Sequence, residues 1–317
     1  MKTWQFLHDK LAASIDVILL YVLESKGSSP GRQGFKMAVA ADNDFSGTIG
    51  GGIMEHKFVE MARAKLQQEV VSSIIYKQVH DKTVTKNQSG MICSGEQTVF
   101  FYKVQQKDIE QIEGLIHSLE AHKNGTLQLS PAGISFSPDI PGNDLYFEQY
   151  DADDFLLIEK TGFKNRLHII GGGHCALALS KLMNGMDFYI TLYEERDGLN
   201  TLEQNMYAHE KKIVASYNDL NELIEEGENV YVVIMTFGYR TDDIALKAIW
   251  NKHFKYIGVL GSRSKMEKMF SAYKRENMNE ELLKNIHSPI GMQIKSQTAE
   301  EIAVSIAAEI ISVKNNV

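Results

Sequence analysis

One glycine-rich turn carries the clearest chemical signal in the sequence. Gly171, Gly173 and Ala176 fit the pattern G-x-G-x-x-A, with an apolar run before them and an apolar helical pattern after them. The first glycine allows a tight turn, the second lets the backbone approach a phosphate, and the small third residue lets helix and strand pack closely. Because N–H groups at a helix start face an anion, this turn and the adjacent His174 predict a phosphate site.

Further polar residues are expected at the same edge of a sheet. Glu194 ends the next apolar strand, about 20 residues beyond the glycines, where dinucleotide-binding domains place a ribose-binding carboxylate. Arg263 and Lys265 follow a later strand and would suit a phosphate. Ligands of parallel sheets bind at the carboxyl ends of the strands, so these residues, Arg196 and the loop 236–240 should converge. A turn without a ligand and a solvated loop are the alternatives.

Two more glycine loops lie in the first half of the chain. Residues 27–34 form a polar loop whose single cation, Arg32, would suit a bound phosphate. A second loop ends in the glycines at 50–52 and leads into a helical pattern that contains Glu55, so it offers backbone N–H groups to an anion. Surface turns or packing turns are the alternative for both loops.

Cys93 is the candidate nucleophile or metal ligand. It lies in a glycine-flanked loop, 90–96, just before an expected strand. A thiolate in an accessible loop can ligate a metal or attack an electrophile, whereas most lone cysteines are buried small hydrophobes. Its sequence neighbours offer no metal-ligand spacing, so a zinc site is not expected. The sequence offers no firm catalytic residue, and Cys93 is a candidate.

Composition limits the class of protein. The chain has 317 residues, a net charge of −8 and 44% hydrophobic residues, which predicts a two-domain globular protein and argues against a nucleic-acid partner. No apolar stretch approaches the roughly 20 residues of a membrane span, and the N-terminus lacks a signal-peptide apolar region. With Cys93 and Cys175 as its two cysteines, we expect a protein of the reducing cytoplasm without disulfides.

Hydrophobic periodicity predicts the elements that position these residues. In the first half we expect helices at 3–13, 53–68 and 107–122, strands at 16–23, 35–41, 73–79 and 97–104, a hairpin at 125–141 and a strand pair at 145–160. In the second half we expect strands at 188–193, 212–215, 229–235 and 256–260, and helices at 218–226, 242–250 and 302–313. The final helix should open with a capping box at 298–301.

This pattern predicts an α/β fold class in two domains. The first, 1–162, is a mixed α/β domain. The second, 163–317, is a Rossmann-like, doubly wound domain, because strands that alternate with helices imply parallel pairing with right-handed crossovers.

Several segments carry a family resemblance. The first domain contains GSSPGRQGFKM, GTIGGGIMEH and MICSGEQTVFF, and the second contains LHIIGGGHCALAL, TLYEER, YIGVLGSRSK, HSPIGMQI and TAEEIAVSIAAEII. Together they resemble the xanthine dehydrogenase accessory factor family, known as XdhC/CoxI. The resemblance implies a chaperone that binds molybdenum cofactor (molybdopterin), protects it, and supports its sulfuration and insertion into molybdenum hydroxylases. It implies a cofactor-handling factor rather than an enzyme that turns over a metabolite.

The resemblance also assigns partners and site residues. A hydroxylase client and a sulfurtransferase are the implied partners, and the oligomeric state stays open between monomer and homodimer. Cys93 falls in the loop associated with cofactor handling, as a molybdenum contact, and the two first-domain glycine loops become pterin or phosphate candidates. The residues predicted to bind the cofactor are Arg32, Gly50, Gly51, Gly52, Glu55, Cys93, Gly171, Gly173, His174, Glu194, Arg263 and Lys265.

Two other functions stay open at this point. The G-x-G-x-x-A turn and Glu194 are also typical of NAD(P)-dependent oxidoreductases. A nucleotide-sensing regulatory module is the third hypothesis, since the same turn can bind a nucleotide without turnover.

Overall fold

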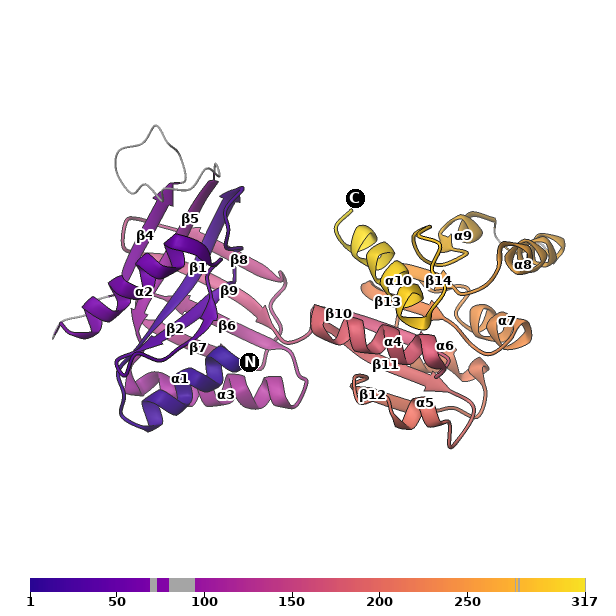
Figure 1. Ribbon diagram of the computed structural model, residues 1–317, viewed down its shortest axis with the longest axis horizontal. Helices are drawn as coiled ribbons and strands as arrows, with labels where there is room; N and C mark the ends of the chain where they lie inside the picture. The colour runs from indigo at the N-terminus through magenta and orange to yellow at the C-terminus, as the bar shows by residue number, and fades with distance from the viewer. Residues whose placement is uncertain (69–72, 80–94, 277, 279, 317) are drawn as a thin grey trace. The chain divides into compact units, whose positions relative to one another are not determined.

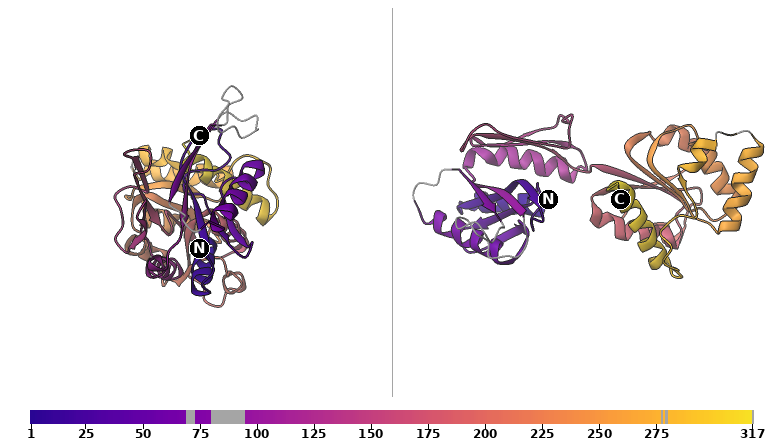
Figure 2. Two further views of the ribbon diagram at one scale, coloured as in Figure 1. Left: turned by 90° about the vertical axis from the view of Figure 1, so that its left-hand side faces the viewer. Right: turned by 90° about the horizontal axis from the view of Figure 1, so that it is seen from above.

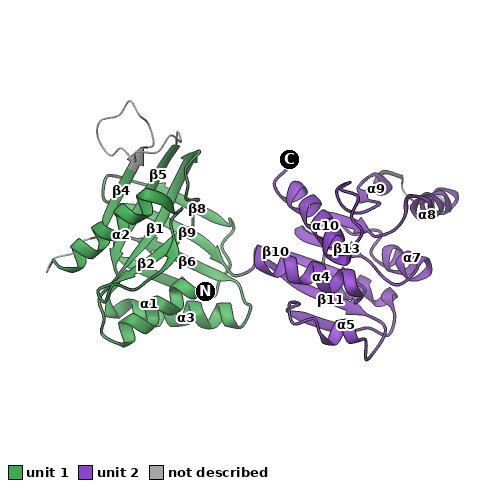
Figure 3. Ribbon diagram, in the orientation of Figure 1, with its two compact units in different colours: residues 1–162 green, residues 163–317 purple. Residues whose placement is uncertain are grey.

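The chain folds into two units, Met1–Gly162 and Phe163–Val317, which Figure 3 draws in different colours. The coordinates are those of a computed structural model, and they describe residues 1–68, 73–79, 95–276, 278 and 280–316 (Figure 1). Within these residues no helix is both long and apolar enough to span a membrane. The predicted α/β fold class is confirmed for both units.

The described residues of unit 1 form two antiparallel sheets and three helices. The five-stranded sheet has the order β3-β2-β1-β5-β4, and the four-stranded sheet has the order β7-β6-β9-β8. The helices are α1 (Lys2–Ala12), α2 (Gly52–Leu66) and α3 (Ile109–Glu120). The strands are β1 (Val17–Gly27), β2 (Lys36–Ala40), β3 (Phe45–Thr48), β4 (Ile74–Val79), β5 (Gly95–Lys103), β6 (Gly125–Ser130), β7 (Gly133–Ser137), β8 (Leu145–Gln149) and β9 (Phe155–Thr161).

Strand β1 is the centre of unit 1 because both of its faces are buried. Leu19 and Tyr21 point into a core shared with α1, α3 and the four-stranded sheet. The right-hand view of Figure 2 shows the magenta helix α3 beside the four-stranded sheet. Ile18 and Leu20, which alternate with them, point into a second core covered by α2. A strand buried on both faces explains the continuous apolar run that the sequence shows here.

Unit 2 is built on one six-stranded parallel sheet of order β12-β11-β10-β13-β14-β15. Numbered from its first strand this order is 3-2-1-4-5-6, the order of dinucleotide-binding domains. The strands are β10 (Asn165–Ile170), β11 (Phe188–Glu194), β12 (Glu210–Ile213), β13 (Gly227–Ile234), β14 (Phe254–Val259) and β15 (Ile286–His287). The helices are α4 (His174–Met183), α5 (Asn200–Glu203), α6 (Leu220–Leu223), α7 (Tyr239–Ala248), α8 (Arg263–Arg275), α9 (Glu280–Lys284) and α10 (Ala299–Lys314).

Helices cover both faces of this sheet, as predicted for a doubly wound domain. Leu167 and Ile169 pack against α4 and α10 on one face, while Ile170 and Val232 belong to the core beneath α6, α7 and α8 on the other. The predicted capping box opens α10, because the Thr298 hydroxyl accepts from the N–H of Glu301 and the Glu301 carboxylate accepts from the N–H of Thr298.

Short elements at the sheet edges and in the connections account for most differences between prediction and structure, and the helices α5 and α9 are among those that were not predicted. Strands β3 and β15 were not predicted, since they are short edge strands and β3 is mostly exposed. Strand β12 lies two residues earlier than expected and α6 ends at Leu223 rather than near residue 226. These segments bury few side chains, so their hydrophobic pattern gives a weak signal.

Candidate functional site

Three loops meet where the strand order of unit 2 reverses. Residues 171–173 follow β10, residues 195–199 follow β11, and residues 235–238 follow β13. We call them the switch-point loops. Ligands of open parallel sheets bind at such a reversal, so these loops form the candidate site of unit 2.

The two outer glycines of the turn have different structural roles. Gly171 has φ of +108°, and a Cβ there would lie 2.4 Å from the carbonyl oxygen of Met235. Only glycine fits this contact between the loops after β10 and β13. A Cβ at Gly173 would meet nothing within 4 Å, and the backbone there is extended. Gly173 therefore borders open space, as a residue beside a ligand must.

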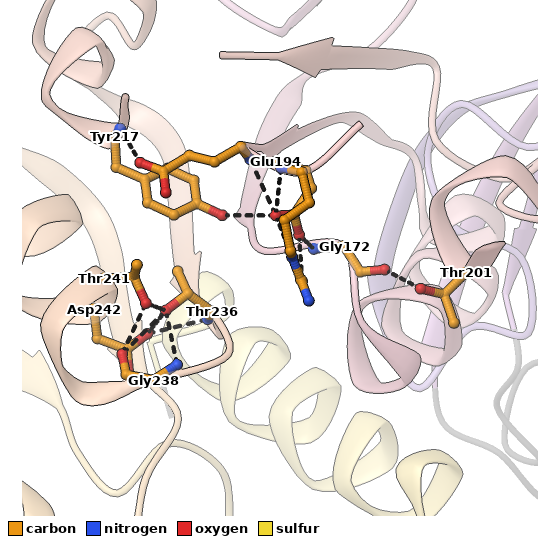
Figure 4. A network of polar contacts seen from close by, with 10 residues as sticks. Gly172, Glu194, Thr201, Tyr217, Thr236, Gly238, Thr241 and Asp242 are labelled. Carbon is orange, nitrogen blue, oxygen red and sulfur yellow. Dashed lines mark hydrogen bonds and ion pairs between the residues drawn. The ribbon is translucent and has the colours of Figure 1, made fainter. Parts of the chain in front are cut away.

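Both backbone polar groups of Gly172 are hydrogen-bonded to side chains. Its N–H donates to Glu194 Oε2 at 2.8 Å, and its carbonyl oxygen accepts from the hydroxyl of Thr201. Figure 4 shows these contacts, with Glu194 also close to Tyr217. The glycine loop is therefore held by the connection between β11 and α5, and its central N–H is already satisfied.

Glu194 is fully buried and bonded inside the protein. Its Oε1 accepts from the N–H groups of Glu195 and Arg196 at 3.0 and 3.1 Å and from Arg196 Nε at 2.9 Å, and its Oε2 accepts from Arg196 Nη2 at 2.8 Å. Burial raises the pKa of this carboxyl, but the bonds from Arg196 and from the N–H of Gly172 outweigh it and lower the pKa to about 2. The carboxylate expected to hold a ribose thus anchors the loops.

Arg196 extends from the end of β11 toward the loop after β13. Its guanidinium carbon lies 5.0 Å from the ring centroid of Phe237, which is 68% exposed. Hydrogen bonds to Glu194 hold the guanidinium of Arg196 in this position. A cation and an aromatic face are therefore presented together at the switch-point loops.

Asp242 organises the loop after β13. Its Oδ1 accepts from the N–H of Thr236 at 3.0 Å and from the Thr236 hydroxyl at 2.6 Å (Figure 4). Its Oδ2 pairs with Lys265 of α8, and Asp242 itself is fully buried. Lys265 was expected to face a phosphate, but in the structure its ammonium group forms an ion pair with the buried carboxylate of Asp242. Arg263, in the first turn of α8, is exposed.

The first turn of α4 offers unused donors. Among the described residues, none accepts a hydrogen bond from the N–H groups of Gly173, His174 or Cys175. His174 is exposed and lines a groove of about 580 Å³ between α4 and α10. The Cys175 thiol is partly buried, and burial together with the charge of Glu300 raises its pKa, so it is not an activated thiolate.

The glycine loops of unit 1 pack against one another. A Cβ at Gly31 would lie 2.0 Å from the carbonyl oxygen of Ile49, and a Cβ at Gly50 would lie 2.4 Å from the backbone nitrogen of Gly31. The side chain of Gln97 donates to the same Ile49 carbonyl at 2.9 Å. Packing therefore explains these two glycines. Arg32 is exposed, and its guanidinium lies 3.4 Å from the carbonyl oxygen of Gly27.

Glu55 occupies the donors of the second glycine loop. Its Oε2 accepts from the hydroxyl of Thr48 and from the N–H groups of Ile49 and Gly51 at 2.9 and 3.0 Å. Burial raises the pKa of Glu55, but these hydrogen bonds outweigh it and lower the pKa below its ordinary value. Of the three glycines expected to face a phosphate, Gly51 thus donates to an internal carboxylate, Gly50 donates to the Thr48 hydroxyl, and Gly52 begins α2.

Replacing this carboxylate should destabilise unit 1. We expect Glu55→Ala to lower the free energy of unfolding by about 1–2 kcal/mol, because the Ile49 and Gly51 N–H groups lose their acceptor. Glu60→Ala, on an exposed part of the same helix, should cost less than about 0.5 kcal/mol. Denaturation followed by the fluorescence of Trp4, the tryptophan of unit 1, in a Trp250→Phe background measures both. An equal loss in the two variants would contradict the role assigned to Glu55.

Two models of known families match the chain. The XdhC Rossmann domain matches residues 167–310, which include the switch-point loops, and the XdhC and CoxI family matches residues 11–73, which include both glycine loops of unit 1. The chain belongs to the XdhC/CoxI family.

Individual relatives of this XdhC/CoxI chain are distant. YqeB of Escherichia coli, described as uncharacterized, is 25% identical over 93% of this chain, which spans only 43% of YqeB. A Bacillus subtilis protein named as a probable subunit of xanthine dehydrogenase is 21% identical over 95% of this chain and 94% of its own length. A solved structure from Bacillus halodurans, named as a xanthine dehydrogenase, superposes with a TM-score of 0.73 at 21% identity, over 99% of this chain and 96% of that one, and shares the fold.

The predicted site residues of this XdhC/CoxI protein fall into separate groups. Gly171, Gly173, His174 and Glu194 meet at the switch-point loops. Gly50, Gly51, Gly52, Glu55 and Arg32 belong to unit 1. Cys93 lies outside the described residues, so its assignment stays a prediction. Among the described residues there is no group of three or more His, Cys, Asp and Glu that could hold a metal ion.

The sequence reasoning placed Arg196 and the loop that contains Phe237 at the converging strand ends but assigned neither residue a role, and it did not select Thr201. The signal for the role of Arg196 was its position two residues after a glutamate that ends a strand, because an arginine and a glutamate at this spacing can form a bidentate ion pair. Nothing in the local sequence pointed to Thr201, whose contact with Gly172 spans 29 residues.

Proposed function

We propose that this XdhC/CoxI chain is an accessory protein that binds molybdenum cofactor and supports its sulfuration and insertion into a xanthine dehydrogenase-type hydroxylase. The observation that carries the proposal is the alignment with the Bacillus subtilis relative, which covers nearly the full length of both chains and whose name refers to xanthine dehydrogenase. The proposed partners are the hydroxylase and a sulfurtransferase.

The phosphate of a molybdopterin fits the described residues of unit 2 better than those of unit 1. At the switch-point loops, the N–H groups of Gly173 and His174 have no acceptor among the described residues, and the guanidinium of Arg196 donates to the same Glu194 oxygen as the N–H of Gly172. In unit 1 the N–H of Gly51 already donates to Glu55. When bound, the cofactor would supply a phosphate and a dithiolene-held molybdenum, and the switch-point loops would hold the phosphate.

The residues of unit 2 can bind and orient such a ligand without carrying out chemistry on it. Glu194 and Asp242 are engaged in internal hydrogen bonds, which makes them supports for the loops rather than proton donors or acceptors. The Cys175 thiol is held in its protonated form by burial and by Glu300. This arrangement supports a carrier role over catalysis for the described part of unit 2.

A nicotinamide-dependent oxidoreductase is the second candidate. The strand order and the G-x-G-x-x-A turn of unit 2 favour it, because both are typical of dinucleotide-binding domains. Hydride transfer to or from a nicotinamide would support this candidate. Nucleotide binding without turnover, coupled to affinity for a partner protein, would support a sensing module instead.

The main test measures cofactor load and cofactor delivery together. The full chain is purified, the bound material is oxidised, and pterin fluorescence is recorded per mole of protein. The same preparation is then mixed with a cofactor-free xanthine dehydrogenase-type hydroxylase, and its activity is measured. We expect a pterin signal and activation of the hydroxylase. Absence of both would contradict the proposal.

The two cysteines offer a matched pair of variants for this test. We expect Cys93→Ser to fold normally and to deliver much less cofactor, because serine lacks the soft thiolate that suits a molybdenum centre. Cys175→Ser should deliver cofactor as the parent does, since the Cys175 thiol is partly buried and not activated. A Cys93→Ser variant with a lower melting temperature and full delivery would show that Cys93 only packs.

A further inference from the structure

Arg196 stands where dinucleotide-binding domains present a carboxylate to a ribose. In those domains the acidic residue at the end of the second strand accepts hydrogen bonds from the ribose hydroxyls. Here that residue is Glu194, and Arg196 covers both of its oxygens with bonds of 2.9 and 2.8 Å. The side chain of Arg196 is 41% exposed, whereas that of Glu194 is fully buried. The group that a ligand meets at this position is therefore a cation.

Glu194 has no capacity left for a ribose. Its two oxygens offer about four lone-pair sites. They already accept from the N–H groups of Gly172, Glu195 and Arg196, from two guanidinium nitrogens and, at 3.4 Å, from the hydroxyl of Tyr217. A ribose hydroxyl would have to displace one of these donors from a buried carboxylate.

Arg196, in contrast, has donors to spare. Its Nε and Nη2 are used on Glu194, and none of the described residues accepts a hydrogen bond from Nη1. Phe237 lies against one side of the guanidinium and leaves most of its own ring exposed. A ligand that contacts both groups should carry an anion, which pairs with the guanidinium, and a flat ring, which stacks on the phenyl face.

We propose that Arg196 is a specificity residue of unit 2. It selects a ligand that carries a phosphate monoester and a planar heteroaromatic ring, and it disfavours the same ligand without that phosphate. The inference rests on the proposed use of the switch-point loops as a ligand site, but it can fail while cofactor delivery stands. Two sources share this chemistry, a 2′-phosphorylated dinucleotide and a pterin with a phosphorylated side chain.

Binding of four compounds to the full chain tests the proposal and separates the two sources. NADPH is compared with NADH, and a pterin with a phosphate monoester on its side chain is compared with the same pterin lacking it, by calorimetry. In at least one pair we expect the phosphorylated compound to bind about tenfold or more tightly, since a charge-assisted bond to the guanidinium is gained. The pair that shows this preference identifies the source.

Variants of the two residues connect the preference to the structure. Arg196→Gln should abolish the preference. Arg196→Lys should keep part of it, because the lysine still places a positive charge beside Glu194. Phe237→Ala should weaken the binding of both compounds of the preferred pair by about tenfold. The preference itself should stay intact, because the variant removes only the stacking face. Phe237 is exposed, so this variant should fold as the parent does. Arg166→Gln, at the opposite end of β10, is the control and should bind as the parent.

Three results would overturn the proposal. They are equal affinity within both pairs, a preference that survives Arg196→Gln, and no binding of any of the four compounds. A ratio of two affinities on one preparation is insensitive to partial unfolding, so a purely structural role for Arg196 would leave the ratio unchanged.

Discussion

Gly171→Ala is expected to lower the free energy of unfolding of unit 2 by about 3 kcal/mol or more. The new Cβ would lie 2.4 Å from the carbonyl oxygen of Met235, and φ of +108° is strained for any residue other than glycine. Gly173→Val should cost no more than about 1 kcal/mol, through a weaker helix cap, because its side chain would enter open space.

The same two variants separate folding from binding. Stability of unit 2 is followed by the fluorescence of Trp250, its single tryptophan, in a Trp4→Phe background. Gly173→Val should lose the pterin that we expect to co-purify with the parent, because its side chain would stand where a phosphate approaches the N–H groups of α4. A Gly173→Val variant that binds pterin, NADPH and NADH as the parent does would show that the ligand site lies elsewhere.

Glu194→Gln is expected to lower the stability of unit 2 by about 3 kcal/mol at pH 7. The Glu194 carboxyl has a folded-state pKa of about 2, below its ordinary value of 4.5. A lowered pKa contributes stability that is fully present above pH 4.5 and is lost as the pH falls toward 2. The difference between parent and variant should therefore shrink to about 1 kcal/mol at pH 3.

Urea denaturation from pH 7 to pH 3, again followed by Trp250 fluorescence, measures this difference. Glu225→Gln is the control, because its side chain is 88% exposed and its nearest cation lies 4.0 Å away. We expect the control to match the parent at every pH. A difference for Glu194→Gln that does not change with pH would mean that folding does not lower the pKa of this carboxyl.

The sequence predicted the frame of unit 2 but not the directions of its side chains. Glu194 was placed correctly at the end of β11, because apolar strands and a glycine turn have a regular spacing. Its contacts depend on Arg196, Tyr217 and Gly172, which only the folded chain brings together. The same holds for Lys265, whose partner Asp242 lies 23 residues away and was expected only as the first residue of a helix.

In unit 1 the prediction was strongest for the central strands and weakest for function. The apolar run at β1 was correctly taken as a buried strand, because both of its faces pack. A glycine loop beside a helix looks the same in sequence whether its donors serve a ligand or an internal carboxylate. In the structure the Gly51 N–H donates to the carboxylate of Glu55, four residues further along the chain, so this donor serves an internal carboxylate.

The second glycine loop of unit 1 and the glycine turn of unit 2 each hold a carboxylate of the chain itself, Glu55 in unit 1 and Glu194 in unit 2. These turns are consequently ordered before any ligand arrives. An incoming anion would not have to wait for a loop to fold, and its association rate would be governed by diffusion and charge. A carrier of the proposed kind would exchange its cargo quickly, because neither capture nor release would require the turn of unit 2 to reorganise.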